Sequence, residues 1–335
     1  MKKEDLRIVF MGTPEFAVES LKTLVENDYN VVGVITMPDK PSGRGYKLKP
    51  SPVKQYALGE GLNILQPEKL KDEEFLNELR KLNADIQIVV AFRMLPEVVW
   101  SMPRKGTFNL HSSLLPQYRG AAPINWAIIN GEKETGVTTF FLSHEIDTGE
   151  IIFRETTEIS DNDNAETLHD RLMAMGAKLV IKTVDAIIED NITAIPQDQL
   201  FTNETTLKPA PKIFTETCRI DWDNSKEVLY NFIRGLSPYP AAWTELENSE
   251  TNERLRLKIF AGEKVEDSAD IEETGSKKSE LFTPGSIFTD NKNYINVSVA
   301  DGLLRITDLQ LSGKKRMKTV DFLNGYKLNE NDRLI

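Results

Sequence analysis

Short apolar runs alternate with apolar residues at helical spacing over the first half of the chain. The first run, residues 7–11, predicts a buried strand; it is followed by Gly12-Thr13-Pro14 and then by a helical stripe. Further strands are predicted at residues 31–36, 85–92, 106–111, 137–142 and 151–159, and helices at 75–82, 123–130 and 165–190. This repetition favours an α/β fold, a doubly wound domain built on a parallel-rich sheet.

The pattern changes after the last of these helices. Residues 191–212 are polar, carry three prolines and lack periodicity, which predicts an extended linker between a domain at 1–190 and a second domain at 213–335. In the second domain Asn224 is expected to cap a helix that stops at Gly235. Alternating apolar residues then predict a small antiparallel barrel. The acidic, serine-rich residues 263–280 are expected to form a mobile hairpin tip.

Composition excludes several classes of protein. The 335 residues hold 41 Lys and Arg against 52 Asp and Glu, a net charge of −11, which argues against a protein that coats nucleic acid with its whole surface. No apolar run reaches the roughly 18 to 20 residues of a membrane span, and the opening residues are typical of a strand rather than a signal peptide. A single cysteine, Cys218, rules out an internal disulfide framework and a multi-cysteine zinc site. We therefore expect a cytoplasmic protein.

The most informative polar residues end the strand predicted at 106–111. Asn109 and His111 lie two apart, so on a strand both side chains project from one face. An amide that donates to a developing oxyanion and an imidazole that moves a proton are the groups that acyl transfer requires. The alternative is that both residues only satisfy hydrogen bonds at a buried strand end.

A third polar group follows the next predicted strand. Asp147 precedes Gly149 and would orient the His111 imidazole and stabilise its charged form, although an ordinary turn aspartate has the same spacing. No histidine cluster has metal-ligand spacing, so no metal site is expected. Gly12-Thr13-Pro14 lacks the other glycines of a dinucleotide fingerprint, and a phosphate-loop motif is absent.

Several separate segments resemble the methionyl-tRNA formyltransferase family over nearly the whole chain. The matching segments are residues 8–17, the active-site signature at 109–123, the aspartate loop at 146–150, and carboxy-terminal signatures at 220–222, 238–240 and 311–315. The resemblance implies a Rossmann-like formyltransferase domain linked to a barrel of oligonucleotide-binding-like (OB-like) topology. It also implies transfer of a formyl group from 10-formyltetrahydrofolate to the amino group of methionyl-tRNA, which yields the formylmethionyl initiator tRNA of translation initiation.

The resemblance assigns roles to individual residues. Asn109, His111 and Asp147 fall on the family's catalytic positions, and its folate-binding stretch falls on Ser113, Leu114, Leu115 and Pro116. The chain departs from the family at Arg93, where a glycine is usual; Arg93 either points away from the pterin or contacts the folate tail. We expect initiator methionyl-tRNA and the folate cosubstrate as partners, no membrane, and a monomer.

Two basic clusters are candidates for tRNA contact. The first holds Lys40, Arg44, Lys47 and Lys49 in a glycine-containing loop, and the second holds Lys314, Lys315, Arg316 and Lys318. The first cluster would also suit a solvated surface loop, and the second a lysine-rich hairpin tip. The first, however, resembles the family's loop that inserts into the tRNA acceptor arm, so an acidic body with two basic contact zones is expected.

Two other functions stay open at this point. A formyltransferase that acts on a nucleotide-linked amino sugar would share Asn109, His111 and Asp147, but the basic loop and the carboxy-terminal signatures argue against it. A non-catalytic RNA-binding protein on the same fold would not need all three of those residues.

Overall fold

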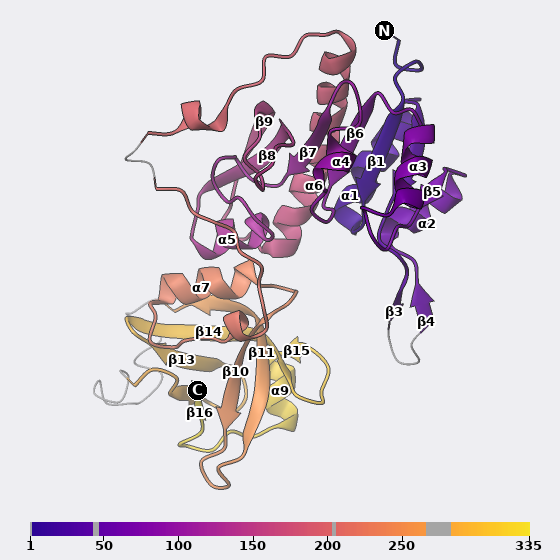
Figure 1. The fold of residues 1–335 in the computed structure, drawn as a ribbon. Helices are drawn as coiled ribbons and strands as arrows, with labels where there is room; N and C mark the ends of the chain where they lie inside the picture. Colours follow the sequence, from indigo (N-terminus) through magenta and orange to yellow (C-terminus); the bar gives the residue numbers. More distant parts are fainter. Residues whose placement is uncertain (1, 43–46, 203–205, 266–282) are drawn as a thin grey trace. The chain divides into compact units, whose positions relative to one another are not determined.

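The computed structural model describes residues 2–42, 47–202, 206–265 and 283–335, and it divides into two compact units (Figure 1). The first unit comprises Met1–Pro123, Glu134–Glu158 and His169–Pro211. The second comprises Ile124–Lys133, Ile159–Leu168 and Lys212–Ile335. None of the helices in the described part of the chain combines the length and the hydropathy that a membrane-spanning helix requires.

A sheet with the strand order β5-β2-β1-β6-β7-β8-β9 forms the centre of the first unit. Its strands are β1 (Ile8–Gly12), β2 (Val31–Ile35), β5 (Ile64–Leu65), β6 (Ile86–Val90), β7 (Thr107–His111), β8 (Glu134–Phe141) and β9 (Ile151–Glu158). Pairing is parallel from β5 through β7 and antiparallel at β8 and β9. Every residue of β1 and β6 is buried, as expected for strands covered on both faces. The predicted parallel-rich α/β sheet is confirmed.

Helices cover both faces of this sheet (Figure 1). They are α1 (Glu15–Glu26), α2 (Pro52–Gly59), α3 (Glu73–Lys81), α4 (Glu97–Trp100) and α6 (Ala165–Ile188), the last of which is shared between the units. On one face, Phe75 and Leu79 of α3 pack with Met11 and Val89. On the other, α6 approaches β7 so closely that a Cβ on Gly176 would lie 2.6 Å from the Leu110 side chain.

Some elements of the first unit are too short to leave a periodic signal, and the sequence pattern did not indicate them. They are α2, α4, β5 and the hairpin of β3 (Lys40–Ser42) and β4 (Lys47–Lys49), which projects from the first unit in Figure 1. The hairpin occupies the place of the predicted basic loop.

The predicted linker at 191–212 is mostly part of the first unit. Ile195 exchanges backbone hydrogen bonds of 2.8 and 2.9 Å with Ile151 at the start of β9, and η1 (Gln197–Leu200) follows. Farther along, the Ala210 carbonyl accepts a hydrogen bond of 2.7 Å from the backbone N–H of Ala121. These backbone bonds join Ile195 to β9 and Ala210 to the loop after β7, so both points of the segment are attached to the first unit.

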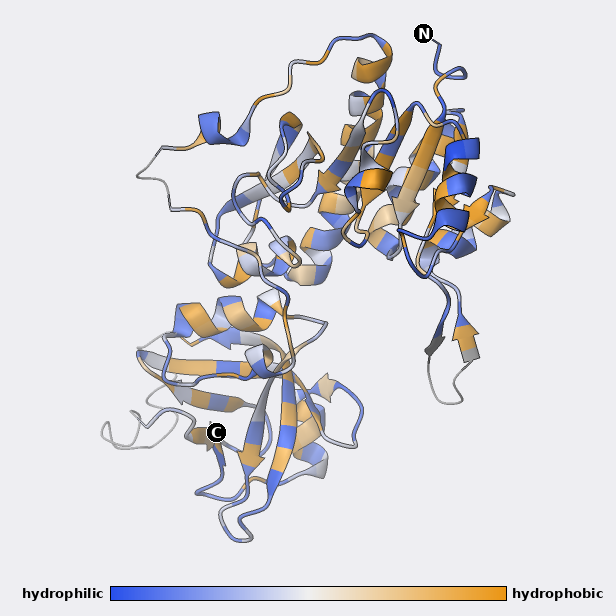
Figure 2. Cartoon of the chain, viewed as in Figure 1, coloured by the Kyte–Doolittle hydropathy of each residue, from blue (hydrophilic) through white to orange (hydrophobic). Residues whose placement is uncertain are grey.

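The second unit is an antiparallel barrel, as predicted. Its strands are β10 (Ala242–Glu247), β11 (Arg254–Lys264), β12 (Ile287–Thr289), β13 (Ile295–Val299), β14 (Gly302–Leu311), β15 (Met317–Lys318) and β16 (Arg333–Leu334). Their order is β12-β13-β14-β11-β10-β16, with β15 on β14, and a bridge between Ser286 and Arg333 joins the two ends and nearly closes the sheet. Figure 2 shows hydrophobic and hydrophilic residues alternating along these strands, the pattern of a barrel with one face inward.

Helices of the second unit correct one predicted detail. The helical elements are α5 (Pro123–Ile129), η2 (Glu216–Cys218), α7 (Lys226–Gly235) and α9 (Thr319–Gly325). The expected cap Asn224 is wrong, because the Ser225 hydroxyl accepts the hydrogen bond from the Val228 N–H. Gly235 is the last helical residue, and a Cβ there would lie 2.7 Å from the Ile129 side chain, so close packing explains this glycine. Residues 266–280 of the expected acidic tip lie outside the described part of the chain.

Candidate active site

The carboxyl end of β7 carries the two polar residues that the sequence analysis singled out. Leu110 faces α6, so Asn109 and His111 on either side of it project from the opposite face. Asn109 pairs in register with Val89 of β6, and His111 lies opposite Thr138 of β8. Asn109 is half-buried and its side chain makes no hydrogen bond to any other described residue. The structure therefore presents an amide with unused hydrogen-bonding groups next to a buried imidazole.

The hydrogen bonds of His111 determine which of its nitrogens is basic. Nε2 lies 2.9 Å from the carbonyl oxygen of Tyr118, and a carbonyl only accepts, so Nε2 carries the hydrogen. In the neutral ring the lone pair is then on Nδ1, which lies 3.9 Å from Oδ2 of Asp147. Because the two side chains are only 7% and 13% exposed, water screens this pair weakly. A proton accepted at Nδ1 would be stabilised by the carboxylate.

Asp147 lies in the loop between β8 and β9 and adopts a left-handed backbone conformation with φ of 56°. Its Oδ2 accepts a hydrogen bond of 3.0 Å from the Gly120 N–H, which fixes the carboxylate on the side of His111. Gly149 continues the loop, and a Cβ there would lie 1.6 Å from the Phe141 carbonyl oxygen. This close approach explains why glycine follows two residues after the aspartate.

The sequence did not indicate the role of two residues in this region. Gln197, from the predicted linker, donates to the carbonyls of Asp147 and Gly149, and Arg119 donates twice to the side-chain oxygen of Gln197. Arg119 stood inside a recognised motif without an assigned role. A lone glutamine in a polar segment carries no motif that would have indicated Gln197.

The predicted folate-binding stretch is a tightly folded turn beside His111. Ser113 and Leu115 are fully buried, and Pro116 is buried and follows a cis peptide bond. The Ser113 hydroxyl donates to the Gln117 carbonyl at 2.6 Å, and the Leu115 N–H donates to the Thr138 hydroxyl at 3.2 Å. These side chains hold the shape of the turn. Leu114 is half-buried, whereas the other three side chains of the stretch are buried. Contact of this stretch with folate stays a prediction.

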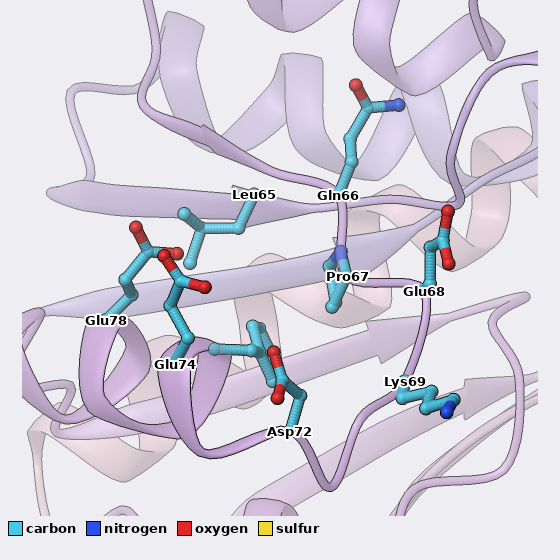
Figure 3. Close-up of a pocket in the computed structure, with 9 residues that line it drawn as sticks. Leu65, Gln66, Pro67, Glu68, Lys69, Asp72, Glu74 and Glu78 are labelled. Atoms are coloured by element: carbon cyan, nitrogen blue, oxygen red, sulfur yellow. The ribbon is translucent and has the colours of Figure 1, made fainter.

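Arg93, the departure from the family pattern, bonds to the chain itself. Its guanidinium donates to the backbone carbonyls of Pro67 and Glu68, the latter at 2.8 Å, and burial lowers its pKa. Pro67 and Glu68 also line a pocket with Asp72, Glu74 and Glu78, which Figure 3 shows between the 65–69 segment and α3. An acidic lining repels anionic ligands such as folate or RNA. This pocket does not include Asn109, His111 or Asp147.

The predicted tRNA contacts of the amino-terminal half lie on the β3–β4 hairpin. Lys40 and Lys49 are exposed, whereas Arg44 and the side chain of Lys47 lie outside the described residues. Asp39 at the base of the hairpin accepts hydrogen bonds from Lys54 at 2.6 Å and from Gln66 at 2.9 Å, and these bonds lower its pKa. The base of the hairpin is thus held to the first unit.

The second basic cluster is only partly available to a ligand. Lys314 and Lys315 are exposed in the turn between β14 and β15. Arg316 instead donates two hydrogen bonds, of 2.9 and 3.0 Å, to Asp308 and stacks 4.3 Å from the Phe260 ring centre. An RNA phosphate would have to compete with Asp308 for Arg316.

The remaining histidines do not extend the site. His144 is exposed and stacks edge-on against Trp100, and His169 stacks against Phe16. Among the described residues, no group of three or more His, Cys, Asp or Glu side chains is placed to hold a metal ion.

Comparison with known sequences identifies relatives over both units. The family model described as formyl transferase matches residues 6–184, and the model of the formyl transferase C-terminal domain matches residues 212–327. A protein of Parabacteroides distasonis named methionyl-tRNA formyltransferase is 64% identical over 328 residues, which cover 98% of each chain. One of the same name from Phocaeicola vulgatus is 61% identical over the full length of both chains.

Comparison with solved structures shows the same fold at low sequence identity. The crystal structure of HypX from Aquifex aeolicus in complex with tetrahydrofolic acid has a TM-score of 0.62 at 17% identity and covers 97% of this chain and 48% of its own. An N-formyltransferase from Helicobacter canadensis, in complex with folinic acid and dTDP-3-aminofucose, has a TM-score of 0.62 at 20% identity, over 93% of this chain and all of its own.

Proposed function

Since the chain belongs to the methionyl-tRNA formyltransferase family, we propose that it transfers the formyl group of 10-formyltetrahydrofolate to the free amino group of methionyl-tRNA. The product is the formylmethionyl initiator tRNA used in translation initiation. The observation that carries the proposal is the pair of the buried His111 and the half-buried Asp147 beside the half-buried Asn109 amide.

Asn109 is assigned to the oxygen of the formyl group. Attack of the amine on the formyl carbon moves negative charge onto that oxygen. The Asn109 amide, which bonds to no other described residue, has N–H groups to donate to it. A neutral amide donor at a strand end suits the site because it stabilises the developing charge without a metal.

His111 is assigned to the proton. The attacking amine must lose a proton, and Nδ1 of His111 is the basic nitrogen because Nε2 donates to Tyr118. Asp147 stabilises the imidazolium that results, and the imidazolium then protonates the departing folate nitrogen. His111 thereby transfers one proton from the attacking amine to the leaving folate nitrogen.

The donor 10-formyltetrahydrofolate supplies an already activated formyl group, and the residues present fit it. The chain needs only to hold the donor, polarise the carbonyl and move one proton. We propose that the turn containing Ser113, Leu114, Leu115 and Pro116 contacts the folate, chiefly through its backbone and Leu114, because the other side chains are buried.

The tRNA contacts are assigned to the β3–β4 hairpin, with Lys40, Arg44, Lys47 and Lys49, and to Lys314 and Lys315 of the barrel. We assign Arg316 a smaller part, because Asp308 already binds it. Asn109, His111 and Asp147 come from one chain, so the reaction needs no second subunit, and we propose a monomer that acts in the cytoplasm, where charged initiator tRNA is used.

A single-turnover assay tests this function. Enzyme is mixed with 10-formyltetrahydrofolate labelled in the formyl group and with either methionyl-tRNA or a nucleotide-linked amino sugar as acceptor. We expect label on methionyl-tRNA alone, and none with His111→Ala. Label on the amino sugar instead, or tRNA binding without transfer, would replace this function by one of the two alternatives.

A further inference from the structure

We propose that Gln197 is a positioning residue for formyl transfer, one that holds the Asp147 loop against the Arg119–Gly120 turn so that the Asp147 carboxylate stays beside His111. The inference rests on the proposed function. It adds a residue that lies outside the active-site signature at 109–123 and the aspartate loop at 146–150. Gln197 is 3% exposed and belongs to the first unit, as do Arg119, Asp147 and Gly149, to which its side chain is hydrogen-bonded.

Every hydrogen-bonding group of the Gln197 side chain is used. Nε2 donates at 2.8 Å to the carbonyl of Asp147 and at 2.9 Å to the carbonyl of Gly149. Oε1 accepts from Nε of Arg119 at 3.1 Å and from Nη2 of the same guanidinium at 2.7 Å. A primary amide has two N–H groups and two lone pairs to offer, so the side chain is fully satisfied. A fully satisfied buried polar group specifies one arrangement of its neighbours.

These bonds close a ring through the catalytic carboxylate. Gln197 binds the Asp147 backbone on one side and Arg119 on the other, and Gly120, next to Arg119, donates its N–H to the Asp147 carboxylate. The same turn also offers the Tyr118 carbonyl to His111. Gln197 thus joins the two loops that hold the two partners of the proton-transfer pair.

A single backbone bridge to β9 fixes the position of Gln197. Two residues earlier, Ile195 exchanges two backbone hydrogen bonds with Ile151, which lies two residues after Gly149. The Ile195–Ile151 bonds therefore hold the backbone of Gln197 beside the Asp147 loop, within reach of its side chain. Asp147 needs such support because its left-handed backbone conformation is one that aspartate adopts only as a minority state.

The loss of Gln197 should act on the chemical step. Gln197→Met keeps the size of the side chain and removes all four hydrogen bonds. We expect kcat to fall about 10- to 100-fold, the range that a misplacement of roughly 1 Å produces, while the Kd values for folate and tRNA change less than about twofold. Gln199→Met is the matched control, since Gln199 lies in the same short helix and is exposed.

A double-mutant cycle separates positioning from general support of the fold. In the Asp147→Asn background the carboxylate is already gone, so we expect Gln197→Met to lower the single-turnover rate less than about twofold further. Should Gln197→Met not fold, Gln197→Glu replaces it, because glutamate keeps the acceptors for Arg119 and loses both donors.

The outcomes are distinct. A normal kcat in the Gln197 variants, or an equal fold-loss with and without the Asp147 carboxylate, overturns the positioning role. Failure of the wild type to formylate methionyl-tRNA overturns the proposed function instead. If the wild type uses an amino-sugar nucleotide, the same Gln197 and Gln199 variants are compared on that acceptor.

Discussion

Oδ2 of Asp147 lies 3.9 Å from Nδ1 of His111, longer than a hydrogen bond, and the same oxygen accepts a bond of 3.0 Å from the Gly120 N–H. The carboxylate is thus held by the backbone and faces the imidazole across a short gap. Its action on His111 is therefore electrostatic at this separation, and it depends on the charge of Asp147 more than on its shape.

Asp147→Asn tests that dependence on charge. Asparagine retains an oxygen that can accept from Gly120, so we expect the loop to keep its structure while the formylation rate falls about 10²- to 10⁴-fold. Single-turnover transfer and thermal unfolding of the same preparations measure the two effects. Glu145→Gln removes an exposed charge from the same loop and should leave the rate unchanged. A fast Asp147→Asn enzyme would contradict the assignment.

Asn109 and His111 should act on one transition state. Asn109→Ala removes an oxyanion donor and is expected to lower kcat about 10²- to 10³-fold. His111→Ala should cost at least as much, and the double variant should be little slower than the slower single variant, because the two groups serve the same step. Rates of all three are compared with circular dichroism spectra. Strictly multiplicative losses would mean that the residues act independently.

Gly149→Ala should disturb the Asp147 loop. The added methyl group would lie 1.6 Å from the Phe141 carbonyl oxygen, so the loop or β8 must move, and we expect a loss of stability of about 1 to 3 kcal/mol together with a slower reaction. Gly59→Ala is the control, because nothing lies within 4 Å of its added Cβ at the end of α2. Denaturant unfolding and turnover measure both variants. Equal unfolding free energies and equal turnover of the two variants would contradict the predicted clash at Gly149.

The β3–β4 hairpin should affect tRNA more than folate. We expect Arg44→Ala to weaken methionyl-tRNA binding and, for single-stranded contacts, to make its salt dependence shallower by about 0.7 in logarithmic slope per lost phosphate contact, with folate affinity unchanged. Arg44→Lys restores the charge but not the planar fork, so weak recovery indicates bidentate or stacking contacts. Lys178→Ala removes an exposed charge from α6 as a control. Wild-type binding by Arg44→Ala would show that the hairpin is only a solvated surface.

Asp308 should make the stability of the barrel depend on pH. Burial raises its pKa, but the hydrogen bonds from Arg316 and Lys318 outweigh burial and hold the pKa below the ordinary value. A lowered pKa in the folded state contributes stability above the unfolded pKa of about 3.9 and loses it as pH falls through the folded value. We expect Asp308→Asn to cost about 1 to 3 kcal/mol at pH 7 and less below pH ~4. Thermal unfolding across this range, with Asp223→Asn as control because Asp223 is exposed and lies outside the helices and strands of the same unit, measures it. A cost that stays constant with pH would contradict the ion pair.

Local spacing determined a large part of this protein from its sequence. The longer strands and helices of the first unit followed from apolar periodicity, because the period of side-chain directions is a property of the backbone itself. The same reasoning placed Asn109 and His111 on one face of a strand, and the structure has both on the face opposite Leu110. Alternation also predicted the barrel.

Tertiary structure decided what those residues meet. The sequence does not encode locally that Gln197, 50 residues after Asp147, binds its carbonyl, or that Gly120 holds its carboxylate. Each of these contacts depends on the register in which distant strands and loops pair, such as Ile151 with Ile195. Hydrophobic burial and backbone pairing set that register over the whole unit, so only the folded chain brings the Asp147 loop, the Arg119–Gly120 turn and Gln197 together.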